Sequence, residues 1–240
     1  MKFSKIQLIF FSFFFIIKVY SQTSINGGNV SGRWQLSNSP YYVVLSITIP
    51  EGDSLIVEPG VCVYINSGAT INVKGRINAI GTNNDTITFN KISGSSYYGW
   101  GGFIFNNTSS LQDSSFFQYC KIAYATNSNT FSFNRFSKCR IENCLFQTTT
   151  PINLKYSSLL IKNNVFKISS FSSWSIVCDS SSSPIIENNI ITHDLYNQSL
   201  GISCGYLSSA VISGNTINAP SAGIKCQYSL SPIILNNNIR

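Results

Sequence analysis

The fold is decided by a stretch that reads Val211-Ile-Ser-Gly-Asn-Thr-Ile217, because five other stretches of the chain repeat its pattern. In each repeat, a central residue has an apolar residue three positions before it and another two positions after it. The central residues are Cys120, Cys144, Asn164, Asn189, Asn215 and Asn237, at steps of 24, 20, 25, 26 and 22 residues. A long period with short strand-like units between turns predicts a stacked solenoid.

A second series runs in step with the first. Cys178, Cys204 and Cys226 each precede an Asn of the first series by eleven residues, as in Gly201-Ile-Ser-Cys204. Alternation places the Ile and the Cys on one face of a strand and the Ser on the other. Asn-Asn or Gly-Asn pairs mark a sharp bend, since both residue types tolerate left-handed backbone angles. Each winding then holds three short strands, which predicts an all-β parallel β-helix with columns of Ile, Phe, Leu and Cys inside.

The N-terminal half shows the same organisation. Turn signals such as Pro59-Gly60 and Lys74-Gly75 separate short apolar runs, and no stretch has the 3.6-residue period of a stable helix. The expected strands cover residues 46–49, 55–57, 61–65, 70–73, 76–80, 86–89 and 103–105. We expect residues 22–46 to form a lead-in or cap and residues 47–240 to form the β-helix domain.

The first 21 residues are typical of a secretory signal peptide. Lys2 and Lys5 precede an apolar run, and a small residue, Ser21, offers a cleavage point before Gln22. Nothing later resembles a transmembrane segment, so the mature chain is expected outside the cell, secreted or at the cell surface. Without the three lysines of this segment, 13 Lys and Arg remain against 9 Asp and Glu, scattered singly. This argues against nucleic-acid binding.

Seven cysteines in an exported protein usually suggest disulfides. Here, however, the expected register sets Cys178, Cys204 and Cys226 side by side, with side chains that run alongside one another, whereas disulfides need converging Cβ atoms. Most of the cysteines are therefore expected to be core thiols. Cys139 could still pair with another cysteine outside that column.

A series of stretches in the N-terminal half resembles a known superfamily. Ile49-Pro-Glu-Gly52, Leu55-Ile-Val-Glu-Pro-Gly-Val61 and Trp100-Gly-Gly-Phe-Ile-Phe105 follow one another in order, with Val73-Lys-Gly-Arg-Ile-Asn-Ala-Ile-Gly-Thr82 between the last two. They resemble the exported bacterial branch of the pectin-lyase-like superfamily. The resemblance implies a right-handed, single-stranded β-helix. It leaves activity open, since the superfamily includes pectate lyases, polygalacturonases, adhesins and proteins without known catalysis.

Catalytic candidates are few. Asp179 is the one carboxylate expected on the outer face after the Gly-Ile-x-Cys strands, and usual glycoside hydrolysis needs two. His193-Asp194 contains the only histidine, in a predicted loop without a nucleophile in register. No cluster of carboxylates suggests a metal site, so calcium would be needed only by a lyase. Glu142, Lys162 and Glu187 are expected to form an exposed ion ladder rather than a catalytic pair.

Aromatic residues give the stronger functional signal. Tyr156, Tyr206 and Tyr228 each follow the Leu/Cys column by two residues, and Ser180 completes the series. Such a column either offers a platform for sugar rings or continues the core as an aromatic ladder. Further ligand-binding candidates beside Ser- and Gly-rich loops are Tyr97, Tyr98 and Trp174.

Three functions remain open from the sequence. The first is a non-catalytic, monomeric exported module, without cofactor, that contacts polysaccharide or acts at the cell surface. The alternatives are a polysaccharide lyase or glycoside hydrolase and a structural adhesin stalk. Residues 233–240 form a full repeat without a cap, which leads us to expect that the chain is a fragment of a longer protein.

Overall fold

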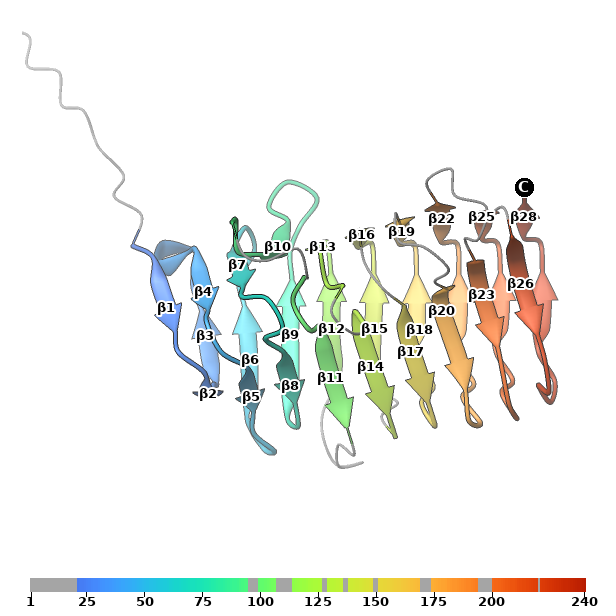
Figure 1. The fold of residues 1–240 in the computed structure, drawn as a ribbon, viewed down its shortest axis with the longest axis horizontal. Helices are drawn as coiled ribbons and strands as arrows, with labels where there is room; N and C mark the ends of the chain where they lie inside the picture. The colour runs from blue at the N-terminus through green and yellow to red at the C-terminus, as the bar shows by residue number, and fades with distance from the viewer. Residues whose placement is uncertain are drawn as a thin grey trace, which may run out of the picture.

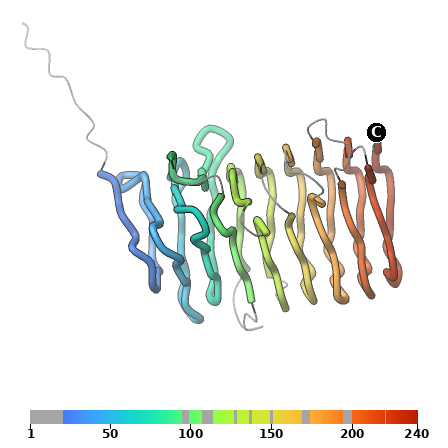
Figure 2. Tube along the Cα trace, viewed as in Figure 1, coloured from blue at the N-terminus to red at the C-terminus, as the bar shows by residue number. Residues whose placement is uncertain are grey.

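A computed structural model describes residues 21–94, 99–106, 114–126, 129–135, 138–148, 151–168, 174–193, 200–219 and 221–240. These residues form a right-handed parallel β-solenoid whose windings stack along the long axis of Figure 1. Figure 2 shows the chain advancing one winding at a time from the N-terminal to the C-terminal end. The predicted signal peptide lies outside the described residues except for Ser21.

Three parallel sheets, named A, B and C, run the length of the stack. Sheet A contains β1 (Thr23–Ile25), β4 (Tyr41–Val43), β7 (Cys62–Ile65), β10 (Ile87–Lys91), β13 (Cys120–Ala123), β16 (Leu145–Gln147), β19 (Val165–Ile168), β22 (Ile190–His193), β25 (Thr216–Asn218) and β28 (Asn238–Ile239). Sheet B contains β2 (Gly28–Asn29), β5 (Ile47–Ile49), β8 (Ile71–Val73), β11 (Phe103–Asn106), β14 (Phe131–Asn134), β17 (Ile152–Lys155), β20 (Trp174–Asp179), β23 (Leu200–Cys204) and β26 (Ala222–Cys226). Sheet C contains β3 (Gly32–Trp34), β6 (Ser54–Val57), β9 (Arg76–Ile80), β12 (Ser115–Gln118), β15 (Cys139–Glu142), β18 (Leu160–Lys162), β21 (Ile185–Glu187), β24 (Val211–Ser213) and β27 (Ile233–Leu235).

Each winding contributes one strand to each sheet, which confirms the predicted three strands per winding. The predicted column register is also present: Cys178 pairs with Cys204, and Cys204 pairs with Cys226. The expected strands agree with β5 to β11 to within one or two residues. The stretch 22–46, expected as a lead-in, contains β1 to β4 and a short 3-10 helix, η1 (Leu36–Asn38). Its strands pair in parallel with the next winding in all three sheets.

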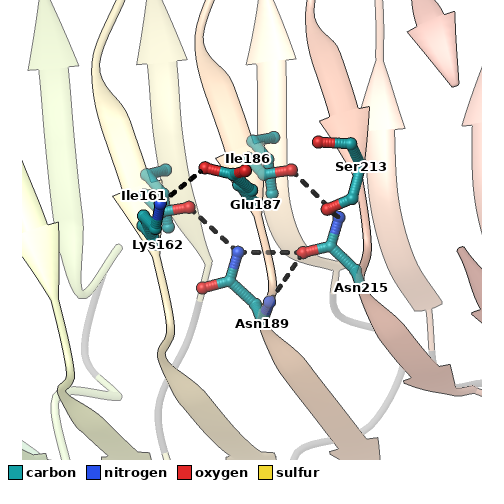
Figure 3. A network of polar contacts seen from close by, with 7 residues as sticks. All are labelled: Ile161, Lys162, Ile186, Glu187, Asn189, Ser213 and Asn215. Carbon is teal, nitrogen blue, oxygen red and sulfur yellow. Dashed lines mark hydrogen bonds and ion pairs between the residues drawn. The ribbon is translucent and has the colours of Figure 1, made fainter. Parts of the chain in front are cut away.

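The corner between sheets C and A is held by a ladder of buried asparagines (Figure 3). The Nδ2 group of Asn189 donates to the carbonyl of Ile161 at 2.9 Å and to Oδ1 of Asn215 at 2.9 Å. Its Oδ1 accepts from the backbone N–H and the Nδ2 group of Asn164, at 2.9 and 3.0 Å. The same bonds recur from Asn215 to Asn237. The ladder thus satisfies buried backbone groups that the sharp bend removes from the sheets.

Two thiols extend this ladder toward the N-terminus. The Sγ of Cys144 lies 3.5 Å from the carbonyl of Phe117, and the Sγ of Cys120 lies 3.3 Å from the carbonyl of Ala79. In the later windings, the equivalent carbonyls accept hydrogen bonds from the asparagine Nδ2 groups. They belong to Ile141, Ile161, Ile186 and Ile212. Burial raises the pKa of the Cys120 thiol well above its usual value, so the thiol stays protonated and can donate. A cysteine therefore replaces the asparagine side chain as the donor to this carbonyl.

The residue before each ladder position makes the bend. Asn163, Asn188 and Asn236 have φ values of 55, 55 and 53°, and Gly214 has 65°. These are left-handed angles, which Asn and Gly adopt at little cost. The Asn and Gly pairs in the sequence therefore divide two roles: the first residue turns the chain and the second supplies the ladder.

Aromatic rings fill the middle of the core. The Phe103 ring stacks on Phe131 at 4.8 Å, and Phe117 meets both rings edge-on at 4.9 and 4.8 Å. Farther along, Phe146 stacks on Phe166 at 4.5 Å. These side chains are almost completely buried. Because in-register strands place equal side chains above one another, rings of neighbouring windings pack with favourable geometry.

All seven cysteines lie in the described part of the chain and are free thiols. Cys139, for which a disulfide remained open, is buried and unpaired, and burial raises its pKa well above the usual value. Cys178 and Cys204 are fully buried, as expected for core thiols. Cys226 is exposed although it pairs with Cys204, because no winding covers it in the structure, and Cys62 is half-buried on an outer face.

Candidate ligand-binding surface

The predicted tyrosines lie at the corner where the chain passes from sheet B to sheet C, along the lower edge of Figure 1. This corner also requires left-handed residues. Tyr156, Ser180 and Tyr228 have φ values of 49, 51 and 57°. The N–H of Tyr156 donates to the carbonyl of Ser180 in the next winding at 3.0 Å. The bends are therefore hydrogen-bonded to one another along the stack.

The tyrosine side chains face solvent. Tyr156, Tyr206 and Tyr228 are 52, 61 and 77% exposed. A ladder that completed the core would bury its rings, so the structure places these side chains outside the core. Backbone bonds hold the corner from which they project, since Leu207 donates to the carbonyl of Tyr228 at 2.9 Å.

Tyr206 departs from the regular column. In its winding the left-handed residue is Leu207, with φ 56°, one position later than at Tyr156 and Tyr228. The N–H of Ser181, instead of that of Ser180, accordingly donates to the carbonyl of Tyr206, at 3.0 Å. The three rings thus share one corner but do not start from one repeated backbone geometry.

A cation lies against the first tyrosine. The guanidinium of Arg135 sits 5.2 Å from the centre of the Tyr156 ring, within the range of a cation–π contact. Arg135 is itself a left-handed corner residue, with φ 57°, and its N–H donates to the carbonyl of Lys155. The sequence did not single out Arg135. Its place in the corner column, one winding before Tyr156, is the signal that would have found it.

Asp179 lies at the same corner, where it supports the turn. Its Oδ1 accepts from the backbone N–H of Ser180 at 2.8 Å, and its carbonyl accepts from the Ser182 hydroxyl at 2.6 Å. It pairs in register with Lys155 on the outer face of sheet B. These contacts give Asp179 a local role in the bend.

The histidine candidate is separated from Asp179. His193 ends β22 in sheet A, so it lies in a strand and not in the expected loop, and it is only 8% exposed. Its Nε2 lies 3.1 Å from the hydroxyl of Ser175, a buried residue of β20 in sheet B. Asp194 lies outside the described residues. The structure therefore does not bring Asp179 and His193 to one site.

The remaining aromatic candidates are scattered. Trp174 begins β20, is half-buried and pairs with Leu200 of the next winding. Tyr97 and Tyr98 fall outside the residues that the structure describes.

A groove of about 430 Å³ on the outer face of sheet B was not foreseen from the sequence. It is lined by the outward-facing residues Thr48, Asn72 and Ile104, and also by Glu51 and Lys74. Alternation in β5, β8 and β11 gives the signal that these side chains share a face. The groove is separate from the tyrosines, which lie in later windings.

The described residues contain no group of three or more His, Cys, Asp or Glu side chains arranged to hold a metal ion. Over the same ranges, no helix has the length and apolar character required to cross a membrane.

Comparison with known proteins adds one match. No curated protein and no solved structure matches the chain. A family model described as the right handed beta helix region matches residues 151–240, the windings that contain the asparagine ladder and the three tyrosines. This match is consistent with the resemblance to the pectin-lyase-like superfamily. The three-sheet architecture of the described residues is that of a right-handed parallel β-helix, and residues 151–240 are similar to the family model for that fold.

Proposed function

We propose that this protein is an exported, non-catalytic β-helix module that contacts polysaccharide through Tyr156, Tyr206 and Tyr228. The observation that carries the proposal is the exposure of all three rings, between 52 and 77%, at one corner of the stack. Exposed tyrosines present an apolar ring face together with a hydroxyl, which suits the apolar face and hydroxyl groups of a pyranose. Export is supported by the signal-peptide pattern of residues 1–21.

The surroundings of the tyrosines favour binding over hydrolysis. Asp179, the nearest predicted acid, already accepts a hydrogen bond from the Ser180 backbone. Its in-register partner on the preceding strand is Lys155, whereas a hydrolase of the usual kind pairs two carboxylates across its cleft. Arg135 against Tyr156 adds one positive charge to the surface, which suits an acidic polysaccharide.

Glycan-array binding with single variants tests the proposal. Tyr206→Ala and Tyr228→Ala should each weaken binding to a bound polysaccharide about fivefold, because one ring contact contributes on the order of 1 kcal/mol. Tyr42→Ala is the matched control, since Tyr42 lies beside Tyr64 on the outer face of sheet A, with ring centres 5.5 Å apart, away from this corner. Loss of binding in the control but not at the corner would contradict the assignment.

Two other results would overturn parts of the proposal. Absence of binding to any glycan would favour the structural stalk. Sustained release of reducing or unsaturated sugar ends from pectin or alginate would contradict the non-catalytic assignment.

A further inference from the structure

The outer face of sheet C carries a column of apolar side chains that has no counterpart on sheet B. Leu160, Ile185, Val211 and Ile233 point outward in register on four successive strands. Ile185 and Ile233 are 46 and 49% exposed, and Leu160 and Val211 are half-buried. Phe116 and Arg140 continue the column toward the N-terminus. Single exposed apolar residues are ordinary, but a contiguous column marks an interaction surface.

The equivalent column on sheet B is mainly polar. It consists of Thr48, Asn72, Ile104, Ser132, Asn153, Val177, Ser203 and Lys225. The two faces are built from the same kind of strand, so strand-forming propensity alone does not account for the difference. Sheet A has a shorter outward apolar column of Leu145, Val165 and Ile190, so sheet C carries the longer of the two such columns.

The apolar column is bordered by two columns of different character. On one side, Ser158 and Ser183 lie next to each other, and the Ser183 N–H donates to the Ser158 hydroxyl at 3.0 Å. On the other side, Lys162 and Glu187 form an ion pair of 3.0 Å, as expected from the sequence. Shallow grooves of about 390 and 250 Å³ lie along this face and share Arg140. Small serines keep one border low, so a flat partner can approach.

We propose that a second copy of this chain docks on the outer face of sheet C. A two-fold axis parallel to the strands, midway between β18 and β21, would place the column against itself in reverse order. Leu160 would then face Ile185 of the second copy, and Phe116 would face its Ile233. Between them, Arg140 would face Val211 of the second copy. Lys162 would face Glu187 of the second copy, and the reverse contact would form at the same time. The Leu160–Ile185 and Phe116–Ile233 contacts and the Lys162–Glu187 charges are thus complementary in one register, as a two-fold interface requires. At the Arg140–Val211 contact, the aliphatic stem of Arg140 would lie on Val211.

The area of this face determines how strongly two copies are expected to associate. Six strands from β12 to β27, about 4.8 Å apart and roughly 12 Å long, give a buried area on the order of 700 Å² in total. Interfaces of this size belong to the weak, transient class. A monomer, as expected from the sequence, is then the dilute form of the protein. Association increases as concentration rises.

Sedimentation velocity over roughly 1 to 200 µM measures this association. The average mass of the unmodified protein should rise toward that of a dimer. Ile185→Lys should abolish the rise, because a charge at the centre of the column would face Leu160 of the second copy. Val177→Lys is the matched control: Val177 is half-buried and outward-facing on sheet B, and its substitution should leave association unchanged.

A charge-exchange pair separates docking from damage to the fold. Lys162→Glu alone and Glu187→Lys alone each set like charges against one another in the pair of copies, so each variant should remain monomeric. An equimolar mixture should associate again, since the carboxylate introduced by Lys162→Glu in one copy would face the ammonium introduced by Glu187→Lys in the other. A monomer at every concentration, association that survives Ile185→Lys, or a mixture that stays monomeric would each overturn the proposal. The glycan-array test changes tyrosines at the corner that borders sheet C, whereas the docking test changes Ile185, Lys162 and Glu187 on its face, so each proposal can fail without the other.

Discussion

Asn189→Ala should lower the free energy of unfolding by about 3 to 6 kcal/mol, one of the two largest effects expected for a single substitution. The change removes the acceptor for the Asn164 N–H and Nδ2 groups and the donor for the Ile161 carbonyl. Asn189 and Asn164 are fully buried, so water cannot replace these partners. Each buried polar group left without a partner costs roughly 1–3 kcal/mol. Urea denaturation monitored by circular dichroism measures the loss.

Two further variants show whether the ladder is responsible. Asn218→Ala removes an exposed asparagine of β25 and should change stability by less than about 0.5 kcal/mol. Asn189→Cys should lower the free energy of unfolding by an amount between those of Asn189→Ala and Asn218→Ala. Cys144 shows that a thiol at this position can still donate to the carbonyl of the preceding winding. Equal effects of Asn189→Ala and Asn218→Ala would show that the amide column does not stabilise the stack.

Phe117→Ala should destabilise the protein by about 3–5 kcal/mol, the usual cost of removing a buried phenylalanine ring. Phe117 is buried and meets the rings of Phe103 and Phe131 at 4.9 and 4.8 Å. Its neighbour Phe116 points to the opposite face of the same strand and is only partly buried. Phe116→Ala should therefore cost about 1 kcal/mol or less.

This adjacent pair tests strand alternation within β12. The two substitutions delete the same atoms from neighbouring positions, so differences in helix or strand propensity cancel. Thermal and urea unfolding measure the stability of both variants. A low protein concentration keeps the proposed self-association from affecting the comparison. Similar losses for Phe116→Ala and Phe117→Ala would mean that the strand does not face the core as described.

The register of the stack could be predicted from sequence because the Asn column and the Cys column repeat at a fixed offset of eleven residues. That offset fixes one strand, a bend and the next strand in each winding. The ion pair between Lys162 and Glu187 followed from the same register. The agreement rests on a period-two pattern that tolerates no slip, since a shift of one residue would turn every core side chain outward.

Other features depended on contacts that a sequence pattern does not contain. Tyr206 shares its offset with Tyr156 and Tyr228, but the bend in its winding falls at Leu207, so the column is locally irregular. His193 follows an Asn bend as a loop residue would, yet β22 extends to it and buries it beside Ser175. Cys120 and Cys144 occupy ladder positions because a thiol can donate a hydrogen bond to a backbone carbonyl, a role that composition does not reveal.

The apolar column of sheet C could not be predicted from the sequence for a related reason. In Ile185-Ile186 and Val211-Ile212, the outward and inward residues are chemically alike. Only the register identifies Ile185 and Val211 as outward. From the sequence alone, an outward apolar residue in such a pair looks like a core residue. Its position relative to the following Asn bend shows which of the two residues faces the core and which faces solvent.

The central claim, that equivalent residues of successive windings lie above one another, is tested most directly by a distance between two spin labels. Labels at Thr48→Cys and Ser203→Cys would mark outward residues of one sheet B column that are six windings apart. Cys62→Ser and Cys226→Ser would remove the two thiols that are not buried. Pulsed electron–electron double resonance should give one narrow distribution near roughly 29 Å, and labels at Thr48 and Val177 should give a distance about 5 Å shorter. A broad distribution, or the same distance for both pairs, would contradict in-register stacking.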